Sequence, residues 1–109
     1  MEVLKPGQIV IINCDDLCLT PEGFALGGIV KDGIVLYEKV DLESFPSTSD
    51  FEGETTLVQT GDIGCVIRFS GRPSNISKDP KWFRYDIYEI FIKGTVRQAF
   101  RQNLEVISP

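Results

Sequence analysis

The chain has 109 residues, of which 42% are hydrophobic and 25% are charged, and its formal net charge is −5. This length and composition are typical of one globular domain and exclude a disordered or fibrous chain. No apolar run approaches the ~18 residues that cross a bilayer, and the first residues lack the basic start and apolar core of a signal peptide. We therefore expect a cytoplasmic protein without a membrane segment.

A first strand and a long insertion are expected in the N-terminal half. Residues 8–13 follow a Pro-Gly turn and are mostly β-branched, which predicts a strand. Residues 29–30 and 34–37 flank Asp32-Gly33, which is a hairpin turn signal. Residues 43–54 have the Ser, Pro, Gly and acid content of a loop. We therefore expect a hairpin and an acidic loop inserted at about residues 14–56.

Strands are expected again after residue 57. Gly61 and Gly64 indicate a tight turn or bulge that leads into a strand over residues 63–69. A polar loop over residues 70–81 separates it from a strand at 84–93, which is followed by strands at 96–101 and 105–107.

The turn between the two long C-terminal strands sets their register. A two-residue loop would place Ile90 opposite Arg97, whereas the three-residue loop 93–95 pairs Ile90 with Gln98 and gathers the large apolar residues on one face. We therefore predict the three-residue loop. Its core face is expected to hold Tyr88, Ile90, Ile92, Val96 and Phe100, with Leu104 added from the last strand, and its outer face Ile87, Glu89, Phe91, Arg97 and Arg101.

The end of the chain carries a resemblance to a known family. The polar residues 101–103 suit a single 3₁₀ turn before the last strand. The order of segments resembles the short SH3-like barrel proteins of tailed phages and bacteria, most of which have no assigned function. The matching segments are Lys5-Pro-Gly-Gln-Ile-Val10, Gly61-Asp-Ile-Gly-Cys-Val66, Tyr88-Glu-Ile-Phe-Ile-Lys-Gly-Thr-Val96, Phe100 and Asn103-Leu-Glu-Val-Ile107.

The resemblance covers residues 5–13 and 57–108 and implies an all-β fold. It implies a single domain over residues 1–109, a small SH3-like, partly open barrel with a long inserted loop or hairpin after the first strand. The segment from Gly61 to Val66 also resembles the glycine turn of KOW-type barrels, which bind RNA or ribosomal partners. A Gly-x-x-Gly turn is equally explained by backbone geometry alone.

The sequence contains few residues suited to catalysis or metal binding. The chain has no His, so a general base or a cysteine nucleophile would lack an imidazole. Cys14, Cys18 and Cys65 offer too few ligands for zinc and are expected to be reduced, packed side chains. Asp15 and Asp16 are best explained as turn residues. We expect a protein that is not an enzyme and that needs no cofactor or metal.

The charges divide the chain into two halves. Residues 1–62 carry twelve acids and three bases, a balance of −9, whereas residues 63–109 carry four acids and eight bases, a balance of +4. Both halves can belong to one barrel whose surfaces compensate, or the bases can form an anion-binding patch. These bases are Arg68, Arg72, Lys78, Lys81, Arg84, Lys93, Arg97 and Arg101.

Aromatic and basic side chains suggest a binding surface. Trp82, Phe83, Arg84 and Tyr85 follow a polar loop, where they either cap the core or form a binding rim. We predict a protein-binding site made by Trp82, Arg84, Tyr85, Phe91 and Arg97, because Trp, Tyr and Arg are enriched at interface hot spots.

The expected function is that of a protein-interaction or structural accessory protein. The resemblance implies a phage-encoded one, found in the host cytoplasm or the virion. The alternative is a KOW-like nucleic-acid-binding barrel that uses the basic half, which the acidic overall charge disfavours.

Overall fold

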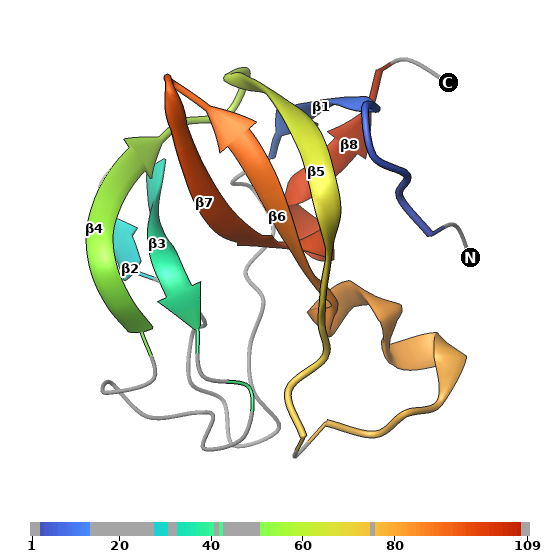
Figure 1. Cartoon of the computed structure of the whole chain (residues 1–109). Helices are drawn as coiled ribbons and strands as arrows, with labels where there is room; N and C mark the ends of the chain where they lie inside the picture. The colour runs from blue at the N-terminus through green and yellow to red at the C-terminus, as the bar shows by residue number, and fades with distance from the viewer. Residues whose placement is uncertain are drawn as a thin grey trace.

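A computed structural model describes residues 3–13, 28–30, 33–40, 42, 51–74 and 76–107, and in this part of the chain the fold is all-β, as predicted. Two 3₁₀ segments interrupt the strands: η2 (Pro80–Tyr85) and η3 (Arg101–Asn103). The strands are β1 (Ile9–Ile12), β2 (Gly28–Val30), β3 (Gly33–Val40), β4 (Phe51–Val58), β5 (Ile63–Gly71), β6 (Ile87–Ile92), β7 (Thr95–Phe100) and β8 (Leu104–Val106) (Figure 1).

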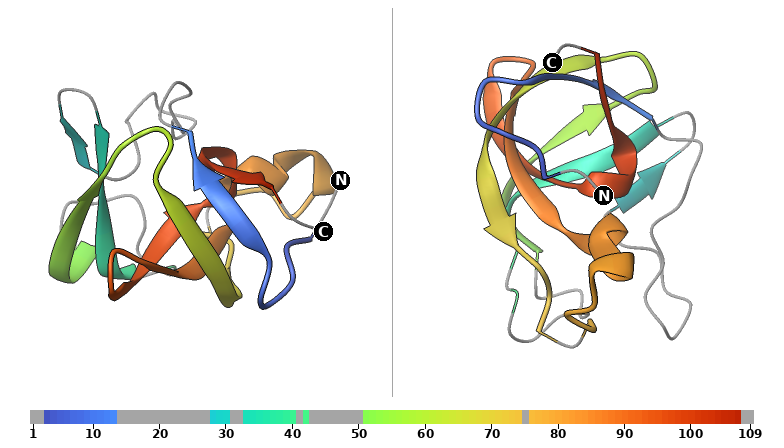
Figure 2. Two further views of the ribbon diagram at one scale, coloured as in Figure 1. Left: turned by 90° about the horizontal axis from the view of Figure 1, so that it is seen from above. Right: turned by 90° about the vertical axis from the view of Figure 1, so that its right-hand side faces the viewer.

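One antiparallel sheet contains all of these strands. Its order is β2-β3-β7-β6-β5-β1-β8, and β4 pairs with β3. The sheet curls strongly, so that β3 and β4 lie on one side of the molecule and β1 and β8 on the other (Figures 1 and 2). Among the described strands no pairing joins β8 to the β2 end, so the sheet is not closed in this part of the chain.

The core lies inside the curl and follows the two-residue period of the strands. In β1, Val10 and Ile12 are buried, and in β6 every second residue from Tyr88 to Ile92 is buried. The backbone N–H of Leu4 donates a 3.2 Å hydrogen bond to the Tyr88 hydroxyl, which ties the N-terminal segment to the core. Burial raises the pKa of Tyr88, although the hydrogen bond from Leu4 opposes this shift.

The register predicted for the β6–β7 hairpin is wrong. Ile92 pairs with Thr95 and Ile90 with Arg97, so the loop is the two residues Lys93 and Gly94. Both have positive φ, 51° and 74°, as a type I′ turn requires, and this turn matches the twist of the flanking strands. The backbone twist therefore determines the loop length, and Arg97 is accommodated on the core face.

The correct register exchanges the predicted faces of β7. Val96 is exposed rather than buried, whereas Arg97 is buried on the core face. Ile87 stays on the opposite face of β6 from Tyr88, but it is buried there next to its partner Phe100. The remaining predicted core residues are confirmed as buried: Tyr88, Ile90, Ile92, Phe100 and Leu104.

The insertion is only partly as predicted. β2 and β3 form the expected hairpin, with Ile29 opposite Ile34. However, Phe51–Val58 is a full strand, so the predicted loop is wrong over residues 51–54. Tyr37 of β3 pairs with Gln98 of β7, which makes the insertion part of the main sheet. The turn residues 31–32 and the loop residues 43–50 lie outside the described residues.

The other predicted boundaries hold to within a few residues, with one exception. Residues 84 and 85 belong to η2 and not to a strand, so β6 begins only at Ile87. The predicted 3₁₀ turn at residues 101–103 is confirmed and delivers the chain to β8, which pairs with β1.

Candidate functional site

The η2 segment is a short 3₁₀ turn with a well-defined start. Pro80 occupies an early helical position, where its fixed φ is favourable and its missing N–H costs nothing. The Asp79 carboxylate accepts a 3.0 Å hydrogen bond from the backbone N–H of Lys81, and the Asp79 carbonyl accepts one from Trp82. These bonds fix the direction in which the side chains of Lys81 and Trp82 leave the backbone.

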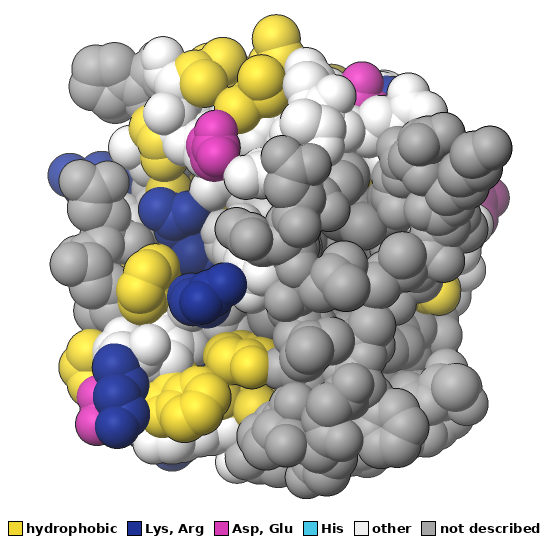
Figure 3. Space-filling view, turned by 180° about the vertical axis from the view of Figure 1, so that it is seen from behind, with side chains coloured by type: hydrophobic (Ala, Val, Ile, Leu, Met, Phe, Trp, Pro, Cys, Tyr) yellow, Lys and Arg dark blue, Asp and Glu magenta, His cyan; other side chains and the backbone are white. Residues whose placement is uncertain are grey.

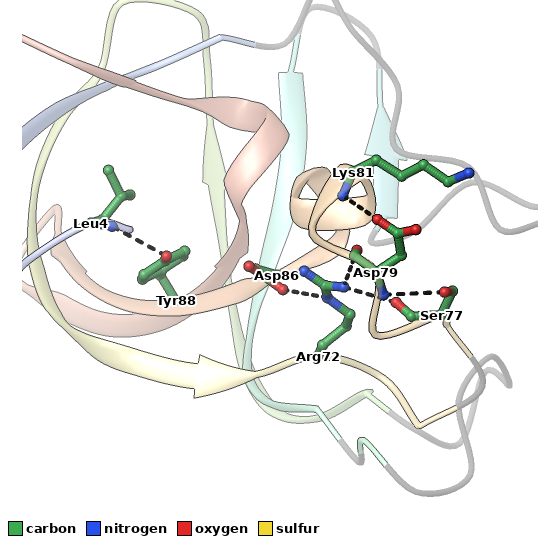
Figure 4. A network of polar contacts seen from close by, with 7 residues as sticks. All are labelled: Leu4, Arg72, Ser77, Asp79, Lys81, Asp86 and Tyr88. Carbon is green, nitrogen blue, oxygen red and sulfur yellow. Dashed lines mark hydrogen bonds and ion pairs between the residues drawn. The ribbon is translucent and has the colours of Figure 1, made fainter. Parts of the chain in front are cut away.

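Arg72 holds this segment against the end of the sheet (Figure 4). Its Nε donates to Asp86 Oδ1 at 2.6 Å, and its Nη1 donates to the carbonyl oxygens of Ser77 and Asp79 at 2.8 and 2.9 Å. The Arg72 and Asp86 side chains are only 15% and 13% exposed. A largely buried guanidinium therefore braces the loop that leads into η2.

Aromatic and basic side chains meet on η2. The rings of Trp82 and Tyr85 are half-buried, with centroids 5.7 Å apart at an interplanar angle of 45°. Lys81 and Arg84 are exposed on the same segment, and exposed Lys78 precedes it. Figure 3 shows dark blue Lys and Arg side chains next to yellow hydrophobic ones on the described part of the back of the molecule. We call Lys78, Lys81, Trp82, Arg84 and Tyr85 the η2 surface.

A second 3₁₀ segment supports the η2 surface. The backbone N–H of Arg101 donates to the Asp86 carbonyl at 2.7 Å. The Arg101 guanidinium carbon lies 6.0 Å from the centroid of the Phe83 ring, within the range of a cation–π contact. The η2 and η3 segments therefore pack together at one end of the curled sheet.

The five predicted site residues do not form one patch. Trp82, Arg84 and Tyr85 share η2, as predicted from their neighbouring positions. Phe91 is exposed on the outer face of β6, and it lies four residues, or about 13 Å of extended chain, beyond the Ile87 end that adjoins η2.

Arg97 lies on the core face of β7 and not on the outer face where it was predicted. It is only 5% exposed and faces the inside of the curl. Its Nε donates to Thr56 Oγ1 at 3.0 Å, its Nη1 donates to the Val96 carbonyl at 2.7 Å, and its Nη2 lies 3.4 Å from Glu54 Oε2. These contacts connect β7 to β4.

Among the described residues, at least four of the eight C-terminal bases are paired with acids. The backbone N–H of Gln59 and the neighbouring Lys93 lower the pKa of Asp62, although partial desolvation opposes them. The other four bases lie in or beside the two 3₁₀ segments. The ion pairs are Arg68–Glu89 at 3.3 Å, Arg72–Asp86 at 2.6 Å, Lys93–Asp62 at 3.2 Å and Arg97–Glu54 at 3.4 Å.

Other predicted features lie partly outside the described residues, including Cys14, Cys18, Asp15 and Asp16. Cys65 is half-buried and reduced. Within the described part of the chain, no group of three His, Cys, Asp or Glu residues is arranged to hold a metal ion. No helix in the same part is long and apolar enough to span a membrane.

Sequence reasoning also missed an exposed apolar face on the outside of the sheet. Ile63, Val96 and Ile107 are all exposed there, together with Phe91. For Val96, the Lys93-Gly94 dipeptide was the signal that could have revealed its place, because a type I′ turn sets the β6–β7 register and with it the outer face of β7.

No protein-family model, curated protein or solved structure matches this chain.

Proposed function

We propose that this chain is a non-enzymatic protein-interaction or structural accessory protein that binds an acidic segment of a partner protein through the η2 surface. The observation that carries the proposal is the gathering of exposed Lys78, Lys81 and Arg84 around the half-buried rings of Trp82 and Tyr85. Trp, Tyr and Arg are the residue types most enriched at interface hot spots.

The local charge favours an acidic partner. Most of the acids lie in residues 1–62, whereas the η2 surface carries three bases within seven residues of chain. An acidic segment with apolar side chains would place its carboxylates near the bases and its apolar groups on the two rings. The brace formed by Arg72 holds these groups in place before binding, which lowers the entropy lost on association.

The family resemblance supports an accessory role. SH3-like barrel proteins close with a strand that enters through a short turn, and here β8 follows η3 and pairs with β1. On this interpretation the chain is a phage-encoded factor, acting in the host cytoplasm or in the virion, with its insertion added to the barrel sheet.

Nucleic-acid binding is the competing function. Basic side chains next to half-buried aromatic rings suit single-stranded nucleic acid, because nucleobases stack on such rings and phosphates bind the basic groups. Against this function, four of the eight bases are engaged with acids and the chain carries a net charge of −5, so few positive groups are available to neutralise phosphates.

The single tryptophan of the chain allows a direct test, because Trp82 reports on its own surface. The protein is titrated with a short peptide of alternating Glu and Leu, with the same peptide carrying Lys in place of Glu, with oligo-uridine and with duplex DNA. We expect a saturable change in Trp82 fluorescence with the acidic peptide and none with the basic one. The double variant Lys81→Glu/Arg84→Glu should weaken binding by about tenfold, since exposed ion pairs contribute roughly 0.2–1 kcal/mol each.

A matched control reverses an exposed base elsewhere. Lys5 lies in the N-terminal segment, and Lys5→Glu should leave the titration unchanged. If the acidic peptide does not change Trp82 fluorescence, the proposal is wrong. Tighter binding of oligo-uridine, weakening steeply between about 50 and 200 mM salt and lost in the double variant, would establish the nucleic-acid function instead.

A further inference from the structure

An apolar row crosses five strands on the outside of the sheet. The Ile107 backbone N–H donates to the Ile9 carbonyl at 3.0 Å, Ile9 pairs with Cys65, Cys65 pairs with Phe91, and Phe91 pairs with Val96. Their neighbours along each strand, such as Val10, Val66 and Ile90, point into the core. We call these five residues the outer row, and with an inter-strand spacing of 4.7–4.9 Å it is about 19 Å long.

The exposure of the side chains varies along the outer row. Ile107, Phe91 and Val96 are 52%, 50% and 40% exposed, whereas Ile9 and Cys65 are half-buried. One residue pair further along the strands, Ile11 pairs with Ile63, which is 60% exposed. A contiguous apolar face of this kind marks an interaction surface, because single scattered apolar residues are the normal state of a protein surface.

Charged residues flank this face on opposite sides. Glu105 pairs with Ile11 and lies on β8, at one end of the second row. On the other side of β5, Gly64 pairs with Ile92. Lys93, the residue after Ile92, therefore lies in the turn between β6 and β7 at the same level along the strands as Ile63. Its side chain is 47% exposed and also contacts Asp62. An acid and a base thus lie on the two sides of β5, at the same height along the strands.

We propose that a second copy of this chain covers the outer row, with a two-fold axis running parallel to the strands along β5. This axis reverses the order of the strands across the interface. It places exposed Phe91 of one copy over half-buried Ile9 of the other, and Val96 over Ile107. Cys65 faces its own equivalent at the centre.

The charges fit the same axis. Glu105 of each copy, two strands from β5, meets the β6–β7 turn of the other copy, where Lys93 lies. The favourable contact therefore forms twice, which is the self-complementarity that an isologous dimer requires. The result is a face-to-face pair of sheets about 10 Å apart, with an apolar centre and a charged rim. This self-complementarity favours a second copy over a different partner.

The first test measures the mass in solution. Sedimentation equilibrium of the full chain should give about twice the 12.2 kDa of one chain, with a concentration-dependent return to the monomer. Phe91→Lys should raise the dissociation constant by at least about tenfold. The matched control is Val3→Lys, which places the same charge on an exposed apolar residue of the N-terminal segment, outside the row, and should leave the dimer unchanged.

The second test measures the geometry. With Cys14 and Cys18 replaced by Ser, a short bismaleimide should cross-link Cys65 to Cys65 of the other copy, and Phe91→Lys should abolish this product. Lys93→Glu and Glu105→Lys should each weaken the homodimer, whereas an equal mixture of the two variants should form a heterodimer, because each interface contact then joins an acid and a base.

The outcomes decide the inference either way. A monomer at all concentrations would overturn it, and so would a dimer that tolerates Phe91→Lys. A dimer that gives no Cys65 cross-link and no preferred heterodimer would overturn the proposed axis. Circular dichroism of each variant confirms that it is folded. None of these substitutions lies in the η2 surface, so the result for the dimer is independent of the result for the proposed function.

Discussion

Replacing Arg72 by Ala tests whether one side chain holds the η2 surface together. The substitution removes an ion pair to Asp86 and two hydrogen bonds to the carbonyl oxygens of Ser77 and Asp79. It leaves the Asp86 carboxylate, which is only 13% exposed, without its guanidinium partner. The perturbation is therefore a broken, largely buried ion pair, and not the loss of a surface charge.

The magnitude follows from burial. Breaking a buried pair costs about 3–5 kcal/mol, and some access of water to Asp86 places this case near the lower end, about 3 kcal/mol. The total stability of a domain is roughly 5–15 kcal/mol, so the loss is a substantial fraction of it. For a chain of this size, 1 kcal/mol corresponds to about 4 °C in Tm, so the melting temperature should fall by about 12 °C. Thermal unfolding followed by circular dichroism measures this shift.

Two further variants make the result specific. Arg72→Lys keeps the charge but loses the fork that bonds three acceptors at once, and should recover only part of the loss. Arg68→Ala removes an ion pair with Glu89 in which Arg68 is 61% exposed, and should cost less than about 1 kcal/mol. If Arg72→Ala melts within about 2 °C of the parent chain, or if Arg68→Ala costs as much, the bracing role is refuted.

Two other outcomes are expected. Gly94 has a φ of 74° with open space around its missing Cβ, so Gly94→Ala should cost about 1 kcal/mol in urea unfolding and Gly94→Asn clearly less, whereas equal losses would contradict the turn. Burial raises the pKa of Tyr88, so its phenol should ionise above pH 10 when absorbance at 295 nm is compared with the Tyr88→Phe variant. Because the pKa of Tyr88 is higher in the folded chain than in the unfolded chain, the protonated phenol stabilises the fold. This contribution is fully present below about pH 10 and is lost as the pH rises through the pKa of the folded chain. A Tyr88 midpoint at or below that of the unfolded chain would contradict the burial of the phenol, because burial is what raises its pKa against the opposing hydrogen bond from Leu4.

The order of the C-terminal elements could be predicted because their signals are local. Alternating apolar residues and glycine turns depend on neighbouring residues only, and the strands and the closing 3₁₀ turn lie close to their expected places. β4 was missed because its sequence, FEGETTLV, is acidic and contains a glycine. Its pairing with β3 and its contact with β7 supply stability that no local propensity records.

The residues of the candidate binding site could be placed together from the sequence only where they are neighbours in the chain. Trp82, Arg84 and Tyr85 stay together because one short segment carries them. Phe91 and Arg97 were added through an assumed register, and a shift of one residue exchanges the faces of a strand. The assumption treated an inward Arg as unfavourable. Arg97 is instead satisfied by Thr56, Glu54 and the Val96 carbonyl, partners that come largely from a strand the sequence did not reveal.

In the folded chain, some acids of the N-terminal half pair with bases of the C-terminal half. Glu54 and Asp62 belong to the acidic half, and they pair with Arg97 and Lys93 of the basic half, so part of the asymmetry holds the two halves together. Among the described residues, exposed positive charge gathers mainly at the η2 surface, whereas the outer row is apolar, with Glu105 and Lys93 beside it on opposite sides of β5. Salt screens exposed charges over about 8 Å at physiological ionic strength and leaves apolar burial largely intact. Under the two proposals the η2 surface binds a charged partner and the outer row binds a second copy of the chain, and each proposal depends on residues that the other does not use.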